Sequence, residues 1–322
     1  MCGMNALTKH STRTAVSANG LRKAYGEKVV LDEIGLSIGE GEVFALLGPN
    51  GAGKTTIVQI LSTLIPADAG RASVMGHDLR DEADAVRAVI GVTGQFCAVD
   101  DLLTGEENLL LMGRLLHLPA AERRARAAGL LERFDLVEAA RRLPATYSGG
   151  MTRRLDIAMT LMGRPRLIFL DEPTTGLDPR GRHTMWQLIR DLVAEGVTIL
   201  LTTQYLEEAD QLADRVAVLD EGRSVAEGTP AALKARIPGG HIRLRFADTA
   251  SLDAAARALP EGTRDDEALV LRVPNGGGIA SLRDVLARLG DGAAVADLSI
   301  HTPDLDDVFF ALTGSTSKEQ TR

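Results

Sequence analysis

The chain has 322 residues, of which 45% are hydrophobic and 25% charged, and its formal net charge is −8. These values are ordinary for a globular protein of one large or two modest domains, and the negative charge does not favour a nucleic-acid-binding surface. Two cysteines, Cys2 and Cys97, exclude a disulfide framework, and we interpret Cys97 as a small buried side chain. No apolar run approaches the roughly 20 residues that a membrane span needs, and no signal peptide is expected.

Continuous apolar runs separated by helical stretches predict an α/β fold with a mostly parallel sheet covered on both faces. The run at 41–48 leads into a helical stretch at 55–65. Further strand-like runs lie at 89–93, 167–170, 197–202 and 215–219. Residues 105–142 differ, because they read as helix throughout, and they predict a helical insertion whose arginines form a solvated face.

The pattern changes after Pro230, where strand-like and helical segments alternate at shorter intervals. Pro238-Gly239-Gly240 is a plausible linker, and a small α+β domain is expected after it. The expected organisation is a flexible tail at 1–14, a main domain at 15–238 with a helical subdomain at about 96–162, an accessory domain at 239–314, and a tail at 315–322.

The stretch GPNGAGKTT at 48–56 matches the pattern G-x-x-x-x-G-K-[ST] of a phosphate-binding P-loop. Its glycines let backbone N–H groups converge on phosphates, and the following helix N-terminus adds a favourable potential. We expect Lys54 to reach the β- and γ-phosphates of ATP and Thr55 to ligate Mg²⁺. The expected ATP-binding residues here are Gly48, Pro49, Asn50, Gly51, Ala52, Gly53, Lys54, Thr55 and Thr56.

A second acidic site is predicted in LIFLDEPTTGLD at 167–178, where an apolar strand ends in Asp171 and Glu172. Two adjacent carboxylates after a buried strand are costly unless they are used. We expect Asp171 to hold Mg²⁺ through water and Glu172 to act as the general base that polarises the attacking water.

The segment YSGGMTRRLDIA at 147–158 resembles the signature of ATP-binding-cassette ATPases, usually read as LSGGQ. Tyr147 and Met151 depart from that pattern, while Ser148, Gly149 and Gly150 keep it. The chemistry fits an anion site, because a Ser hydroxyl and Gly N–H groups at a helix start can contact a γ-phosphate. In that family the phosphate belongs to nucleotide bound by the opposing subunit.

The resemblance, which covers residues 15–235, assigns four further residues. Tyr25 matches the aromatic residue that stacks on adenine, although a packing role is more common for a lone tyrosine. Gln95 matches the glutamine that senses Mg²⁺ and the attacking water. Asp178 matches the loop that touches the partner subunit. Gln204 stands where the family usually has a histidine that contacts the γ-phosphate, and the resemblance implies a catalytic role for it together with Glu172 and Gln95.

A narrower resemblance is to daunorubicin/doxorubicin-resistance-type exporters, carried by TTQYLEEADQLADRVAVLDEGR and by PDLDDVFFALTG at 303–314. It implies a homodimer that sandwiches two ATP molecules, and a separate integral membrane permease that exports a drug-like hydrophobic compound. It also places the chain peripherally on the cytoplasmic face of the membrane. Leu102, Leu103 and Leu109–Leu111 are candidates for the coupling surface, although core packing explains most of them equally well. The sequence does not identify the cargo.

Two alternatives stay open from the sequence. A soluble ATPase switch without a transporter would usually need two cassettes or a long coiled coil, and neither is present. A sensor module that binds ATP without turnover is disfavoured by the Asp171-Glu172 pair, whereas Gln204 leaves it possible.

Overall fold

The computed structural model describes residues 13–94, 98–236, 240–275, 278–289, 294–301 and 304–313. It contains two compact units, Met1–Pro230 and Ala231–Arg322, which are described separately below. The dividing point lies before the linker that the sequence indicated at 238–240, with the short helix α8 (Pro230–Lys234) between the two positions.

The first unit is organised around a six-stranded sheet with the order β10-β9-β3-β8-β7-β6. The strands β3, β8, β7, β6 and β9 are parallel, and β10 pairs with β9 in the antiparallel direction at one edge. Every residue of β3, β7 and β8 is buried, which explains their unbroken apolar runs. The bounds are β3 Val43–Leu47, β6 Ile90–Thr93, β7 Leu167–Asp171, β8 Thr198–Thr203, β9 Arg215–Asp220 and β10 Arg223–Gly228.

A separate antiparallel sheet, with the order β2-β1-β4-β5, packs in the same unit. Its strands are β1 Thr14–Tyr25, β2 Lys28–Gly39, β4 Ala69–Val74 and β5 His77–Asp78. Side chains from both sheets and from helix α1 (Lys54–Leu61) form one hydrophobic core. The sequence did not predict this second sheet, because two of its strands pair across about 60 residues, as in Val16 with Val74.

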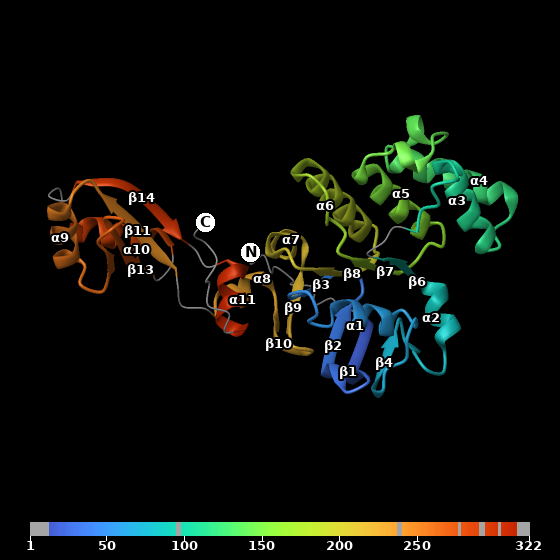
Figure 1. Cartoon of the computed structure of the whole chain (residues 1–322), viewed down its shortest axis with the longest axis horizontal. Helices are drawn as coiled ribbons and strands as arrows, with labels where there is room; N and C mark the ends of the chain where they lie inside the picture. Colours follow the sequence, from blue (N-terminus) through green and yellow to red (C-terminus); the bar gives the residue numbers. More distant parts are fainter. Residues whose placement is uncertain are drawn as a thin grey trace, which may run out of the picture. The chain divides into compact units, whose positions relative to one another are not determined.

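Helices cover the parallel sheet and form the expected insertion, which Figure 1 shows as α3, α4 and α5 grouped together beyond β6 and β7. The prediction of continuous helix over 105–142 is wrong in detail. Helix α3 ends at Leu115, His117 has a positive φ of 55°, and Pro119 is the N-cap of α4. The helix is therefore interrupted just before the proline. The bounds are α2 Ala83–Val89, α3 Gly105–Leu115, α4 Ala120–Arg133, η1 Val137–Ala139, η2 Pro144–Thr146, α5 Gly149–Leu161, α6 Pro179–Ala194 and α7 Leu206–Leu212.

The second unit has a ferredoxin-like β-α-β-β-α-β order, with an antiparallel sheet β12-β13-β11-β14. Alternate residues of β11, Ile242, Leu244 and Phe246, point into a core shared with α9 and α10. The bounds are β11 His241–Phe246, α9 Thr249–Ala258, β12 Thr263–Asp265, β13 Val270–Pro274, α10 Gly278–Leu289, β14 Val295–His301 and α11 Leu305–Thr313.

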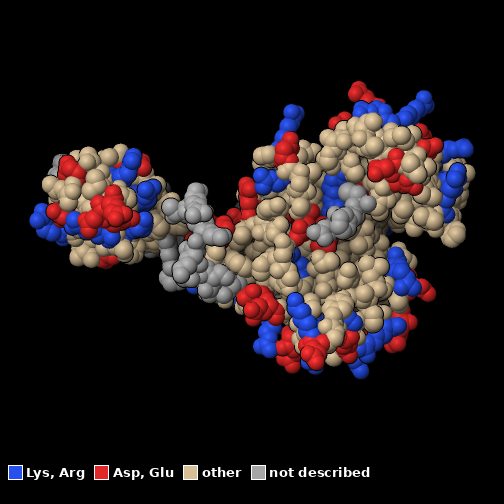
Figure 2. Space-filling model, in the orientation of Figure 1, with Lys and Arg blue, Asp and Glu red and all other residues tan. Residues whose placement is uncertain are grey.

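Two surface observations bear on partners. Among the described residues, no helix is both long enough and apolar enough to cross a bilayer. Acidic and basic side chains are interspersed over the face of the first unit that Figure 2 shows.

Candidate functional site

The carboxyl ends of three parallel strands bring the sequence-predicted P-loop and acidic residues together. Leu47 at the end of β3 is in register with Thr203 of β8, and Asp171 at the end of β7 is in register with Thr202. The P-loop follows β3 directly, and α1 starts at Lys54. Ligands in open α/β sheets bind at this edge, so the strand order itself assembles the site.

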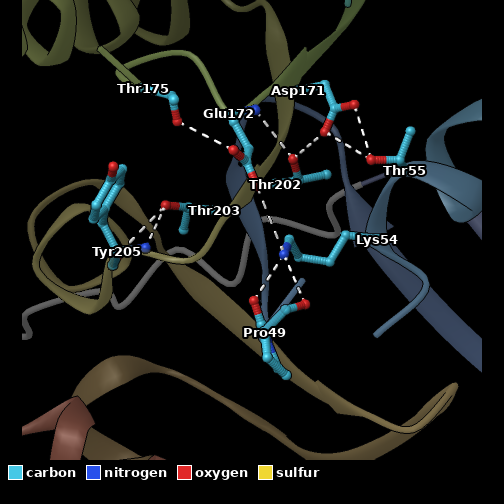
Figure 3. A network of polar contacts seen from close by, with 10 residues as sticks. Pro49, Lys54, Thr55, Asp171, Glu172, Thr175, Thr202, Thr203 and Tyr205 are labelled. Atoms are coloured by element: carbon cyan, nitrogen blue, oxygen red, sulfur yellow. Dashed lines mark hydrogen bonds and ion pairs between the residues drawn. The ribbon is translucent and has the colours of Figure 1, made fainter. Parts of the chain in front are cut away.

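Lys54 lies at the centre of this site with its side chain almost fully buried (4% exposed). Its Nζ donates to the carbonyl oxygens of Gly48 at 2.7 Å and Pro49 at 3.1 Å, and lies 3.8 Å from Oε1 of Glu172 (Figure 3). Burial lowers the pKa of the Lys54 ammonium, and the carboxylates of Glu172 and Asp171 oppose that effect. Because the partners of the ammonium group are neutral carbonyl oxygens, a phosphate oxygen can replace them.

Two glycines of the P-loop are required by the backbone path. Gly53 has φ 101°, and a Cβ there would come within 2.5 Å of Leu31. A Cβ on Gly48 would lie 2.4 Å from the carbonyl oxygen of Leu219. The loop therefore packs tightly against β2 and β9.

Asp171 is joined to the P-loop by side-chain hydrogen bonds. Thr55 Oγ1 donates to Asp171 Oδ2 at 3.1 Å, and Thr202 Oγ1 donates to Oδ1 (Figure 3). Asp171 itself is only 4% exposed. A hydroxyl and a carboxylate so placed are hard oxygen donors next to the phosphate loop, which is the ligand type that Mg²⁺ prefers.

Glu172 adopts an unusual backbone conformation, with φ 48° in the left-handed region. Its N–H donates to the carbonyl oxygen of Thr202 at 3.2 Å and to Thr202 Oγ1 at 3.1 Å, while Thr175 Oγ1 donates to its carboxylate at 3.1 Å. This conformation is unfavourable by roughly 1–3 kcal/mol for a residue with a side chain. Here it turns the carboxylate of Glu172 toward Lys54, whereas Asp171 faces Thr55.

Of these side chains, Lys54, Thr55 and Glu172 line a hollow of about 310 Å³. Its lining contains part of the predicted P-loop together with Glu172, namely Val30, Asn50, Gly51, Gly53, Lys54, Thr55, Thr56 and Glu172. Ala52 is buried beneath the loop, where its N–H donates to the Pro49 carbonyl. The predicted phosphate-binding segment and the predicted base thus share one cavity.

The signature residues lie at a different hollow, of about 540 Å³, which contains Ser148, Gly149, Gly150 and Asp178. Ser148 is the N-cap of α5 and accepts from Met151 N–H at 3.3 Å, and Asp178 is the N-cap of α6 and accepts from Gly181 N–H at 2.6 Å. Two helix N-termini therefore open into the same hollow, with no predicted P-loop residue in its lining.

The remaining predicted residues are placed as follows. Tyr25 ends β1 and is half exposed (51%), with Lys23 Nζ 5.7 Å from its ring centre. Gln204 follows β8 directly and is partly buried. Gln95 and Cys97 lie outside the described residues.

Two residues that organise the site were not singled out from the sequence. Thr202 bridges Asp171 and the Glu172 backbone from a neighbouring strand, and Arg153 on α5 donates to the Asp171 carbonyl. The only sequence signals were a Thr pair ending an apolar strand and an Arg followed three residues later by Asp156, and both patterns are common.

Comparison with known proteins agrees with this geometry. A family profile of ABC transporters matches residues 31–175. The chain is 50% identical over 304 residues to the daunorubicin resistance ATP-binding protein DrrA3 of Streptomyces coeruleorubidus, covering 94% of this chain and 96% of the relative. It is 46% identical over 319 residues to the doxorubicin resistance ATP-binding protein DrrA of Mycobacterium tuberculosis, covering 95% and 96%.

Solved structures give the same assignment. The cbiO1 subunit of an ABC transporter complex from Clostridium perfringens matches with a TM-score of 0.65 at 26% identity, covering 77% of this chain and 96% of that one. A dimeric ATP-binding cassette, MJ0796, bound to ADP and phosphate, matches with a TM-score of 0.60 at 29% identity, covering 66% and 98%. The chain belongs to the ATP-binding subunits of ABC transporters, a family that hydrolyses ATP to drive transport.

Proposed function

We propose that this chain is the ATP-hydrolysing subunit of an exporter for drug-like hydrophobic compounds, acting with a separate membrane permease. The observation that carries the catalytic part is the convergence of Lys54, Thr55, Asp171 and Glu172 at one sheet edge. The export part is supported by resemblance to relatives whose names specify daunorubicin or doxorubicin resistance.

The binding step follows from the contacts of Lys54. When ATP enters, its β- and γ-phosphates replace the Gly48 and Pro49 carbonyls as partners of Nζ, and the P-loop N–H groups surround them. Tyr25 stacks on the adenine from the exposed end of β1. The buried ammonium loses little solvation on binding, because the fold has already removed most of its water.

The donor set fits Mg²⁺. Thr55 Oγ1 and the Asp171 carboxylate would hold the ion, Asp171 through water, and Gln95 is proposed to sense it. Bound there, Mg²⁺ neutralises charge on the phosphate oxygens. Thr202 keeps the Asp171 carboxylate oriented whether or not the ion is bound.

Hydrolysis is assigned to Glu172. Its carboxylate accepts a proton as a water oxygen bonds to the γ-phosphorus, and the bond between that phosphorus and the ADP oxygen breaks. Lys54 stabilises the negative charge, and Gln204 donates a hydrogen bond to a γ-phosphate oxygen. The left-handed backbone at Glu172 holds the base in position before ATP arrives.

The active unit is proposed to be a homodimer in which Ser148, Gly149, Gly150 and Asp178 contact ATP bound by the partner. This accounts for a second hollow lined by helix N-termini but by no P-loop residue. The dimeric MJ0796 structure is a relevant precedent within the family.

The test is Glu172→Gln. The variant should bind Mg·ATP with unchanged affinity, stop hydrolysing it, and elute as a dimer in saturating Mg·ATP, because pairing needs the phosphates and not the base. Wild-type chain without ATP should elute as a monomer, which serves as the reference. A monomeric Glu172→Gln chain in saturating Mg·ATP would contradict the composite site.

Coupling to a permease is tested separately. Expressed with its permease, the chain should be recovered peripherally on the cytoplasmic face of the membrane, and expressed without it, in the supernatant. Stable recovery in washed membranes without a permease would contradict this. Recovery in the supernatant even with every candidate permease would favour the alternative, a soluble ATPase switch not coupled to transport.

A further inference from the structure

Arg153 makes an unusual set of contacts for a helical side chain. It lies on α5, five residues after Ser148, and is only 6% exposed. Its Nη2 donates to the Asp171 carbonyl at 3.0 Å and its Nε to the Pro173 carbonyl at 3.3 Å. One guanidinium group thus donates hydrogen bonds to the backbone carbonyls on both sides of Glu172.

The same guanidinium also reaches toward the helical insertion. Nη1 donates to the Gly94 carbonyl at 2.9 Å and to Asp156 Oδ2 at 3.1 Å. Asp156, 3% exposed, accepts from Ala98 N–H at 3.0 Å through its other oxygen. The pair therefore connects α5 to the end of β6 and to the first described residue of the segment that follows.

A purely structural role would explain a buried ion pair but not this geometry. Such pairs contribute little net stability, and well-packed apolar residues often replace them without loss. Arg153 sends three of its four hydrogen bonds to carbonyls of two other segments rather than to Asp156. A planar fork of donors can hold several acceptors at fixed angles, which a lysine cannot do.

We propose that Arg153, anchored by Asp156, is a positioning residue that ties the Ser148–Gly150 end of α5 to the backbone around Glu172. A shift of α5 when Ser148–Gly150 engage the partner's ATP is then transmitted to the base of the chain's own site. The inference rests on the roles proposed above for Glu172 and for Ser148–Gly150.

Two variants test it, each measured as full-length chain. Arg153→Lys keeps the charge beside Asp156 but cannot hold carbonyls on both sides. The double variant Arg153→Met with Asp156→Leu removes the pair without leaving an unpaired charge, so its Tm should stay near wild type. In both, the Kd of Mg·ATP for the lone chain should be unchanged, and kcat of the assembled transporter should fall by about ten- to a hundredfold, because the base is misplaced.

Arg126→Met is the matched control. Arg126 lies on α4, donates to the Met162 carbonyl at 2.6 Å and pairs with Glu122, away from both hollows. Its loss should lower Tm and leave kcat per folded subunit unchanged.

Wild-type kcat in folded Arg153→Lys or in the folded double variant would overturn the proposal, as would a raised Kd with unchanged kcat. If the double variant does not fold, Arg153→Lys alone decides. Failure of the proposed function has a different signature, namely continued hydrolysis in Glu172→Gln.

Discussion

The P-loop hollow and the signature hollow are built in opposite ways. At the first, charged side chains are buried and already hydrogen-bonded, because Lys54 donates to two P-loop carbonyls and Asp171 accepts from the hydroxyls of Thr55 and Thr202. In the second, Ser148, Gly149 and Asp178 are exposed, and the two side chains among them cap their own helices. The first hollow offers buried, directed side chains, whereas the second offers two helix N-termini with the side chains of Arg154 and Arg180 in the same lining.

The difference indicates a division of work. Side chains held in a dry environment can act at defined atoms, so the P-loop hollow is suited to binding and chemistry. Exposed helix N-termini attract any anion of suitable shape without a buried charge, so the signature hollow is suited to reversible pairing. Substitutions in the two hollows should therefore change different measured quantities.

The largest effect that separates the hollows is expected for Gly149→Asp. A Cβ there meets nothing closer than Leu177 at 3.9 Å, and a carboxylate in the first helical turn favours the helix, so the chain should fold. In the proposed dimer the added charge would face the partner's γ-phosphate, and juxtaposed like charges cost several kcal/mol, so turnover should fall more than about a hundredfold. Measurements of Mg·ATP affinity, elution volume and ATPase rate should show intact binding without a dimer.

Gly129→Asp is the control for that variant, because Gly129 is an exposed helical glycine on α4 with open space around it. It should keep the dimer and the rate. A Gly149→Asp chain that still dimerises in Mg·ATP would remove the signature hollow from the pairing surface.

A smaller effect is expected at Gln204, which directly follows β8 at the sheet edge where the P-loop also begins. A hydrogen bond to a charged group contributes roughly 1.5–3 kcal/mol, so Gln204→Ala should slow steady-state hydrolysis by about ten- to a hundredfold. Gln204→His should be tolerated, since both side chains place a donor near the same oxygen. A wild-type rate in Gln204→Ala would show that this residue takes no part in hydrolysis. An inactive wild type that Gln204→His makes active would show that the site binds ATP without turnover, as in a sensor module.

Glu208 offers a test of a buried carboxyl that no proposed catalytic step uses. It is 1% exposed, and Trp186 Nε1 donates to its carboxylate at 3.3 Å. Burial raises the pKa of the Glu208 carboxyl, with Glu172 adding to the shift and the neighbouring polar side chains of Thr203, Thr174 and Trp186 opposing it. The folded state therefore binds a proton more tightly than the unfolded state, and this group makes stability fall as pH rises from the ordinary Glu range through the raised pKa.

Glu208→Gln removes that pH dependence while keeping an oxygen for Trp186. Urea midpoints of wild type and variant, measured across this pH window, should converge at acid pH and separate above it, with the variant the more stable. Parallel curves would show that the carboxyl is solvated in the folded chain.

The smallest effect is expected for removal of the accessory domain. All described candidates for phosphate contact end by Gln204, so a chain ending at residue 238 should bind Mg·ATP with unchanged affinity. The full-length chain, titrated in parallel, is the reference. Complete loss of binding in a folded truncation would show that residues 239–314 complete the nucleotide site. The accessory domain would then have to be added to the two hollows as a third part of that site.

The sequence was most informative where function is written in contiguous residues. The P-loop and LIFLDEP each carry their chemistry within about ten positions, and an apolar strand before Lys54 or Asp171 is enough to place them. The α/β class followed from the same strands. The break at Pro119 could also have been predicted, because proline ends a helical pattern. It was missed because the residues on both sides have a helical pattern rich in arginine.

What the sequence did not predict depends on pairing between distant segments. Thr202 becomes part of the site only because β8 lies between β3 and β7, an order that no local pattern encodes. Arginine is usually a surface residue, yet Arg153 is buried because backbone carbonyl oxygens of two separate segments, at Gly94 and Pro173, accept hydrogen bonds from it. Likewise, the second sheet combines local hairpins with one pairing across a long separation, that of β1 with β4.

Trp186 gives these ideas a practical handle, because it is the only tryptophan in the chain. Its indole N–H donates a hydrogen bond to Glu208, its ring centre lies 5.0 Å from that of His183, and Asp178 is the N-cap of its helix. The chain thus carries a single tryptophan, on the helix whose N-terminus opens into the signature hollow. Stopped-flow emission from unlabelled protein can therefore time nucleotide capture against the concentration-dependent meeting of two subunits, with no dye attached to either surface.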